Sequence, residues 1–231
     1  MERGYISTAV ALVIAGFLIA CLPTNGSSSI KEQVIAASVQ IDDYCSGTII
    51  QSDDIDGDGV YVNKILTAKH CFTTVGGYEN IGTAIPIHHF SYIDGVRQDD
   101  TPLIFFIEKY NDGDLALLTM YSTTQLPSIP IATQSVEDSL EFGEDVLNVS
   151  FPGIIEQFYR EGFLGHINLD GWQTADLSVM GGSSGSSLVT SRRGTPFVIG
   201  VLRSMIANDY MLEGSITQWS SAQDIIDFIG E

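Results

Sequence analysis

The chain has 231 residues, of which 44% are hydrophobic, so it can bury the core of one large β domain or of two smaller lobes. This composition excludes global disorder. The formal net charge of −19 disfavours a phosphate-binding surface, and therefore predicts that nucleic acid is not a partner.

The first 21 residues have the order of an export signal. A short polar start is followed by an apolar run from Ala9 to Ala20, and then by the polar stretch PTNGSSS. Residues 18–21, LIAC, resemble a bacterial lipobox, in which the cysteine receives a diacylglycerol. We predict a protein exported to the periplasm or cell surface and held at the membrane by a lipid on Cys21. An uncleaved anchor helix from Tyr5 to Leu22 and ordinary secretion are the alternatives.

After a predicted polar tether, residues 22–33, short β-rich runs alternate with turn signals along a domain of residues 34–231. The expected strands are 34–41, 45–50, 60–68, 102–110, 114–120, 144–151, 162–169, 186–190 and 196–204. The last segment is a helix, because Ser221 and Asp224 form a capping box before an apolar face of Ile225, Ile226 and Ile229. Many short strands and one terminal helix predict a closed, all-β architecture.

An acidic turn lies between the second and third expected strands. Asp54, Asp56 and Asp58, followed by Gly59, spell the first half of a calcium loop, but Ile65 occupies the position at which an EF-hand needs an acidic residue. We predict a solvated hairpin tip. A calcium ion completed by carboxylates from elsewhere is the alternative, and no other cofactor is expected.

The chain has three cysteines: Cys21, Cys45 and Cys71. If Cys21 carries a lipid, the other two form an even pair in an oxidising compartment. A metal site would need more ligands than this pair and His70 offer. A disulfide between Cys45 and Cys71 would stabilise the domain by roughly 3 kcal/mol.

Three separated motifs supply the residue types of nucleophilic catalysis. His70 ends LTAKH, Asp114 leads the apolar strand DLALL, and Ser184 lies in the glycine-rich GSSGSSL. A serine hydroxyl needs a base to take its proton, and a buried carboxylate can orient that imidazole. The N–H groups of Gly182 and Ser184 are candidates for an oxyanion hole.

These motifs, with CSGTII before them, resemble those of the chymotrypsin-like serine peptidases, over roughly residues 34–229. The resemblance implies a catalytic triad of His70, Asp114 and Ser184, and a disulfide between Cys45 and Cys71. It also implies two six-stranded antiparallel β-barrels, about residues 34–125 and 135–231, with a short C-terminal helix.

Two departures separate the chain from the digestive members of that family. Ser183 stands where those members have the aspartate that pairs with a newly cut N-terminus, and no matching start exists near Ile30. The sequence is closer to the bacterial glutamyl endopeptidases and HtrA-like proteases. Arg203 stands where the family has a small residue near the catalytic aspartate.

The specificity pocket is less clearly marked. Its floor is expected near Ser178, with walls from Val179 and from the strand that contains Arg203. Because Ser178 is not acidic, a small or apolar substrate side chain is favoured over lysine or arginine.

The predicted function is a secreted serine endopeptidase that cleaves polypeptides through an acyl-enzyme intermediate. The alternative is a catalytically impaired pseudoprotease that serves as a surface-tethered protein-binding module.

Overall fold

The computed structural model describes residues 28–42, 44–72, 80–93, 96–110, 112–152, 157–167, 172–206 and 214–230. The predicted signal peptide with Cys21 lies outside these residues, so export and lipidation stay predictions. Among the described residues, no helix has both the length and the apolar character needed to cross a membrane.

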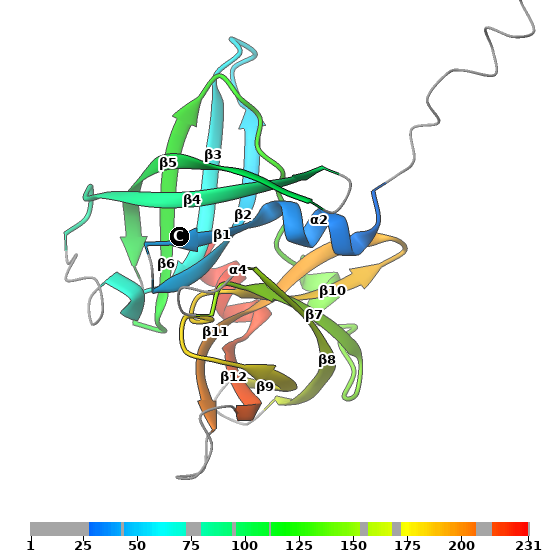
Figure 1. Ribbon diagram of the computed structural model, residues 1–231. Helices are drawn as coiled ribbons and strands as arrows, with labels where there is room; N and C mark the ends of the chain where they lie inside the picture. Colours follow the sequence, from blue (N-terminus) through cyan, green and yellow to red (C-terminus); the bar gives the residue numbers. More distant parts are fainter. Residues whose placement is uncertain are drawn as a thin grey trace, which may run out of the picture.

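Six antiparallel strands form the first barrel, in the upper half of Figure 1. They are β1 (Ser38–Ile41), β2 (Cys45–Asp54), β3 (Tyr61–Ala68), β4 (Ala84–Ile93), β5 (Val96–Tyr110) and β6 (Leu115–Ser122). Their order is β1-β2-β3-β6-β5-β4, and the pairing of β1 with β4 closes the barrel.

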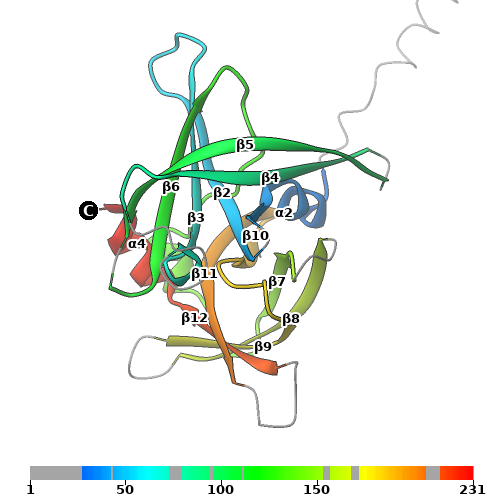
Figure 2. The ribbon, with the colours of Figure 1, turned by 60° about the vertical axis from the view of Figure 1, so that its left-hand side comes forward.

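A second barrel repeats this arrangement in the lower half of Figure 1 and of Figure 2. Its strands are β7 (Asp145–Ser150), β8 (Phe158–Ile167), β9 (Trp172–Val179), β10 (Ser187–Arg192), β11 (Thr195–Ile206) and β12 (Gly214–Ser220). The order is β10-β11-β12-β9-β8-β7, closed by β10 against β7. The predicted all-β fold of two six-stranded barrels is confirmed.

The N-terminal part of the predicted domain differs from expectation. Residues 34–41 were expected to form one strand, but a helix, α2 (Ile30–Ala37), precedes β1 and begins inside the predicted tether. Ser29 and Glu32 form a capping box at its start, in which each side chain accepts a hydrogen bond from the other residue's backbone N–H. Val34 and Ala37 are buried beneath it, which secures the helix to the domain.

Two further helices complete the described structure: α3 (Gln134–Glu137) and α4 (Ala222–Gly230). The predicted capping box of α4 is present, because Ser221 and Asp224 exchange two hydrogen bonds of 3.1 Å. The buried face of α4 is Ala222, Ile225 and Phe228, whereas Ile226 is only partly buried.

The two barrels share an apolar interface. Ile225 and Phe228 of α4, with Val201 of β11, belong to the same buried cluster as the core residues of the first barrel. The C-terminal helix therefore returns to the first barrel, where the Lys109 ammonium group donates a hydrogen bond to the carbonyl of Phe228. The site described below lies at this junction.

Candidate active site

His70 and Asp114 meet because β3 ends beside the start of its neighbouring strand, β6. The antiparallel register of β3 and β6 pairs Ala68 with Leu115. One residue further on, the Lys69 N–H donates a hydrogen bond of 2.9 Å to the Asp114 carbonyl. The pairing of these strands therefore brings together two residues that are 44 positions apart in the sequence.

Both oxygens of the Asp114 carboxylate are used to hold His70. The backbone N–H of His70 donates to Oδ1 at 2.8 Å, and the ring Nδ1 lies 2.8 Å from Oδ2. Since an ionised carboxylate only accepts hydrogen bonds, Nδ1 carries the hydrogen, and Nε2 is left as the basic nitrogen. Asp114 has a φ of 69°, a strained conformation for a non-glycine residue that these bonds hold in place.

Ser184 is the second residue of the second of two consecutive tight turns. The Ser183 N–H donates to the Met180 carbonyl, and the Ser186 N–H donates to the Ser183 carbonyl. The third residues of these turns are Gly182 and Gly185, with φ values of 94° and 81°. A type II turn requires positive φ at that position, which explains the two glycines.

The serine loop, residues 182–185, is attached directly to the first barrel. Ser46 of β2 donates from its backbone N–H to the Ser184 carbonyl at 2.8 Å, and from its hydroxyl to the Gly182 carbonyl at 2.9 Å. The Ser184 carbonyl also lies 3.8 Å from Sγ of Cys71, the residue after His70. These contacts bring the segments that carry His70, Asp114 and Ser184 to one junction between the barrels.

Along this loop, N–H groups that donate a hydrogen bond to a described residue alternate with N–H groups that do not. Those of Ser183 and Gly185 donate to the carbonyls of Met180 and Leu202. Those of Gly182 and Ser184, the predicted oxyanion donors, make no hydrogen bond within the described residues. Donors held in this way are suited to receive an oxyanion.

Ser183 places a neutral hydroxyl where the digestive members of the family have an aspartate. Its side chain is buried, and Oγ lies 3.0 Å from the hydroxyl of Ser150 on β7. The Met180 N–H also points to this oxygen, at 3.4 Å. The position is therefore satisfied within the second barrel by neutral hydrogen bonds.

Arg203 of β11 contacts the carboxylate that holds the histidine. Its Nε is 3.8 Å from Oδ2 of Asp114, which is close enough for an ion pair but too long for a hydrogen bond. Burial lowers the pKa of Arg203, while the negative charges of Asp114 and Asp224 oppose that change. Both hydrogen bonds between Asp114 and His70 are present beside this guanidinium.

The predicted disulfide joins Cys45 to Cys71, with 6.0 Å between their Cα atoms. Cys45 precedes Ser46 and Cys71 follows His70. The disulfide thus connects β2, the strand that holds the serine loop, to the residue that follows His70.

Two other histidines of the first barrel contact different residues. His88 and His89 lie on β4, where the ring of His88 stacks near Phe90. A ring nitrogen of His89 is 2.8 Å from the Ala36 carbonyl of α2. Both histidines therefore serve packing in the first barrel.

The residues expected to form the specificity pocket lie on two strands. Ser178 and Val179 end β9, where Ser178 is exposed and Val179 packs in the core of the second barrel. Arg203 is on β11, beside Asp114. The pocket itself stays a prediction.

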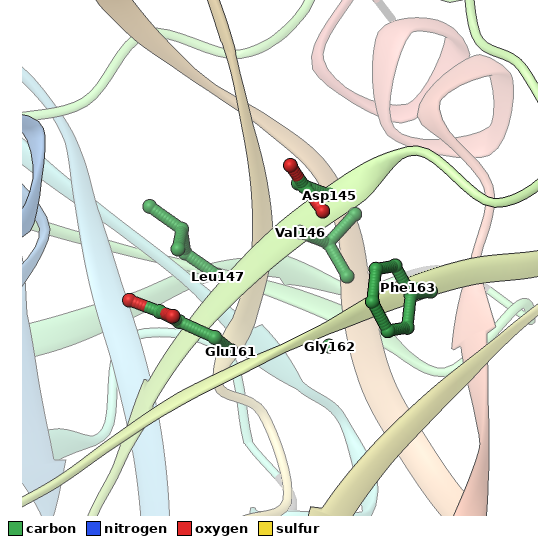
Figure 3. A pocket seen from close by; sticks show the side chains of 6 residues that line it. All are labelled: Asp145, Val146, Leu147, Glu161, Gly162 and Phe163. Atoms are coloured by element: carbon green, nitrogen blue, oxygen red, sulfur yellow. The ribbon is translucent and has the colours of Figure 1, made fainter.

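A pocket of about 350 Å³ lies elsewhere on the second barrel. Figure 3 shows that its lining comes from neighbouring segments of β7 and β8: Asp145, Val146, Leu147, Glu161, Gly162 and Phe163. None of the residues expected in catalysis or specificity lines it.

The acidic turn forms the tip of the β2–β3 hairpin, as expected. The Asp54 carboxylate accepts hydrogen bonds from the N–H groups of Gly57, Asp58 and Gly59. Within the described residues, no group of three or more histidine, cysteine, aspartate or glutamate side chains is placed to hold a metal ion. The alternative of a calcium ion at Asp54, Asp56 and Asp58 is untested.

Two closed β-barrels with an imidazole–carboxylate pair on one and a glycine-framed serine on the other define the chymotrypsin-like class of protein. The family model described as trypsin-like peptidase domain matches residues 45–201, and the chain belongs to this family. The predicted membership of the chymotrypsin-like peptidases is confirmed.

Solved structures with a similar fold include two of an HtrA-type protease and one of a serine endoprotease. The HtrA-type protease AlgW with a tripeptide is 17% identical, with a TM-score of 0.63 over 88% of this chain and 63% of that chain. A variant of AlgW with a tripeptide is 16% identical, with a TM-score of 0.63 over 88% and 62%. A serine endoprotease from Yersinia pestis is 20% identical, with a TM-score of 0.59 over 88% and 66%.

The chain thus spans less than two thirds of the length of these three proteins. No curated protein matches it in sequence.

Proposed function

We propose that the chain is a serine endopeptidase that hydrolyses polypeptides, with Ser184 as nucleophile, His70 as general base and acid, and Asp114 as the carboxylate that orients the imidazole. The observation that carries this proposal is the pair of 2.8 Å contacts between Asp114 and His70. They leave Nε2 as the basic nitrogen at the junction where the serine loop meets the first barrel.

In the proposed reaction, Nε2 of His70 takes the hydroxyl proton of Ser184 while Oγ bonds to the carbonyl carbon of the substrate. The N–H groups of Gly182 and Ser184 stabilise the oxyanion that forms, and each such donor contributes about 3 kcal/mol. His70 then passes the proton to the leaving amine as the peptide bond breaks. Water repeats both steps to release the acid and regenerate Ser184.

We further propose that the enzyme works outside the cytoplasm, tethered by a lipid on Cys21. The LIAC sequence and the Cys45–Cys71 disulfide support this location, because disulfides persist mainly in oxidising compartments. Expression in a bacterial host with a clickable fatty acid tests the tether. The wild type should incorporate the label and Cys21→Ala should not, whereas an unlabelled wild type would contradict the lipid anchor.

A fluorophosphonate probe tests the chemistry. The folded wild-type protein should gain one covalent adduct on Ser184, and Ser184→Ala should gain none. Ser186→Ala, which removes a neighbouring hydroxyl of the same segment, is the matched control and should still be labelled. A folded protein that resists the probe and cleaves no peptide in a library would instead support the binding-module alternative.

A further inference from the structure

Ser46 holds the serine loop through several hydrogen bonds, a role that the sequence did not predict. It is fully buried in β2, on the first barrel. Its hydroxyl donates to the Gly182 carbonyl at 2.9 Å and accepts from the Phe151 N–H at 2.9 Å. Its backbone N–H donates to the Ser184 carbonyl at 2.8 Å. One residue therefore contacts two peptide groups of the loop and the segment that follows β7.

These bonds fix every second peptide group of the loop at both ends. The group between Gly182 and Ser183 is held by Ser46 at its carbonyl and by Met180 at its N–H. The group between Ser184 and Gly185 is held by Ser46 at its carbonyl and by the Leu202 carbonyl at its N–H. The direction of the remaining two N–H groups, of Gly182 and Ser184, follows from these fixed neighbours.

A glycine at position 182 makes such an anchor necessary. Glycine adopts positive and negative φ with similar ease, so the residue itself does not select the turn that orients the N–H. The hydrogen bond from the Ser46 hydroxyl to the Gly182 carbonyl selects that turn. Ser46 is itself held in place, since the Thr67 hydroxyl donates to its carbonyl at 2.7 Å and the disulfide begins at Cys45.

We propose that the Ser46 hydroxyl is a positioning group for the oxyanion hole, through which the first barrel orients the Gly182 N–H of the second. This inference rests on the proposed function, because it assigns the donors to a peptidase reaction. Ser46 touches no reacting atom, so its removal should affect stabilisation of the transition state more than binding of the substrate.

The test compares Ser46→Ala with Ser52→Ala in the full chain. Ser52 lies on the same strand, is also buried, and likewise accepts from a backbone N–H, that of Leu126, while donating to Asn63. Both variants should lose thermal stability. Only Ser46→Ala should lower kcat, by about 10- to 100-fold with KM changed less than about threefold. Its affinity for a peptide aldehyde, a mimic of the tetrahedral intermediate, should fall by a similar factor.

Ser46→Thr retains the hydroxyl and should keep most of the wild-type kcat. If Ser46→Ala does not fold, Ser46→Cys, whose thiol is a weaker donor, is judged by the same criteria. Equal kcat values for Ser46→Ala and Ser52→Ala would overturn the inference, as would a loss confined to KM.

A crystal structure of Ser46→Ala separates this inference from the proposed function. The backbone of Gly182, and with it the direction of its N–H group, should change in Ser46→Ala and not in Ser52→Ala. Reorientation in a protein whose wild type cleaves nothing would remove the proposed function and leave the positioning role. An active wild type whose loop is unchanged in Ser46→Ala would support the proposed function and remove the positioning role.

Discussion

The two barrels contribute to the candidate site in different ways. The first barrel brings His70 and Asp114 together through its own β3–β6 register, and both carboxylate oxygens of Asp114 accept hydrogen bonds from His70. The second barrel carries Ser184 in a loop whose carbonyls at 182 and 184 accept hydrogen bonds from Ser46 of the first barrel. The hydrogen bonds between His70 and Asp114 therefore form within one barrel, whereas the hydrogen bonds that hold the serine loop form only when the barrels dock.

This difference predicts which changes act locally and which act across the junction. Changes within the first barrel's pair should remove chemistry and leave the fold intact. Changes where the serine loop meets β2 and β3 should remove chemistry and stability together. Changes far from the junction should affect stability alone.

The largest expected effect is that of His70→Ala. Loss of the base should lower kcat by about 10⁴- to 10⁶-fold with little change in melting temperature, because the ring is partly exposed. His89→Ala is the matched control, since that ring, on β4 of the first barrel, also makes a hydrogen bond of 2.8 Å, in its case to the Ala36 carbonyl of α2. Peptide hydrolysis measured for both variants checks this. Similar losses in both would show that His70 has no special role.

Gly185→Ala should damage both activity and stability. A Cβ there would lie 2.1 Å from the Thr67 hydroxyl and 2.4 Å from the Ser46 carbonyl, and φ is 81°. Gly194 has the same kind of backbone, with φ of 83°, but open space around its Cβ position. We expect Gly185→Ala to cost at least about 2 kcal/mol more in unfolding free energy than Gly194→Ala. Equal values from denaturant titration would mean that the barrels do not meet closely at Gly185.

Removal of the disulfide should weaken the first barrel's hold on the junction. Replacing Cys45 and Cys71 together by alanine should lower the free energy of unfolding by roughly 3 kcal/mol on the chain-entropy model. Because β2 remains paired with β1 and β3 in the sheet, kcat below the melting temperature should fall less than about tenfold. A complete loss of kcat in a folded variant would contradict this.

The smallest effect is expected at an ion pair within the second barrel. Glu144 and Arg192 form two contacts, of 2.5 and 2.8 Å, and the Thr190 hydroxyl also donates to this carboxylate. Burial acts to raise the pKa of Glu144, but the hydrogen bonds and charge of Arg192 outweigh it, and the pKa is lowered overall. A lowered folded-state pKa means that the stabilisation is present at neutral pH and is lost as the pH falls through that pKa.

Glu144→Gln should therefore destabilise by about 1 kcal/mol at pH 7. The difference from wild type should shrink as acid protonates Glu144, at pH values below the ordinary range for a glutamate. Glu108→Gln, at the more exposed pair with Lys64 on the first barrel, should cost less. Thermal melts across pH check both variants. A gap for Glu144→Gln that persists in acid would contradict the ion-pair explanation, and neither variant should change kcat.

The sequence predicted the parts of the fold and site that local patterns encode. Most strands with β-branched or apolar runs were found, but β4 was missed, although buried Ile85 and Ile87 alternate with partly buried residues. The capping box at Ser221 was found. The same pattern at Ser29 and Glu32 was missed, although it marks the start of α2. β9 was also missed, although Ala175, Leu177 and Val179 alternate inward with exposed residues between them.

Other features depend on contacts between distant segments. β12 buries polar Thr217, whose hydroxyl accepts from the Trp219 ring and donates to the Ala175 carbonyl, so no apolar run marked it as a strand. Likewise, CSG was recognised as part of a motif, but the role of Ser46 depends on a loop 136 residues away. The position of Arg203 beside Asp114 is also set by the docking of the two barrels.

The most direct test of a serine loop completed by the opposite barrel is a crystal structure of the wild type with a peptide boronate. We predict a bond from boron to Ser184 Oγ, with one boronate oxygen about 2.7 to 3.1 Å from the N–H groups of Gly182 and Ser184. The contacts from Ser46 to the loop should be unchanged. Boron bound to another residue, or a boronate oxygen facing away from these N–H groups while Ser46 keeps its contacts, would contradict the account.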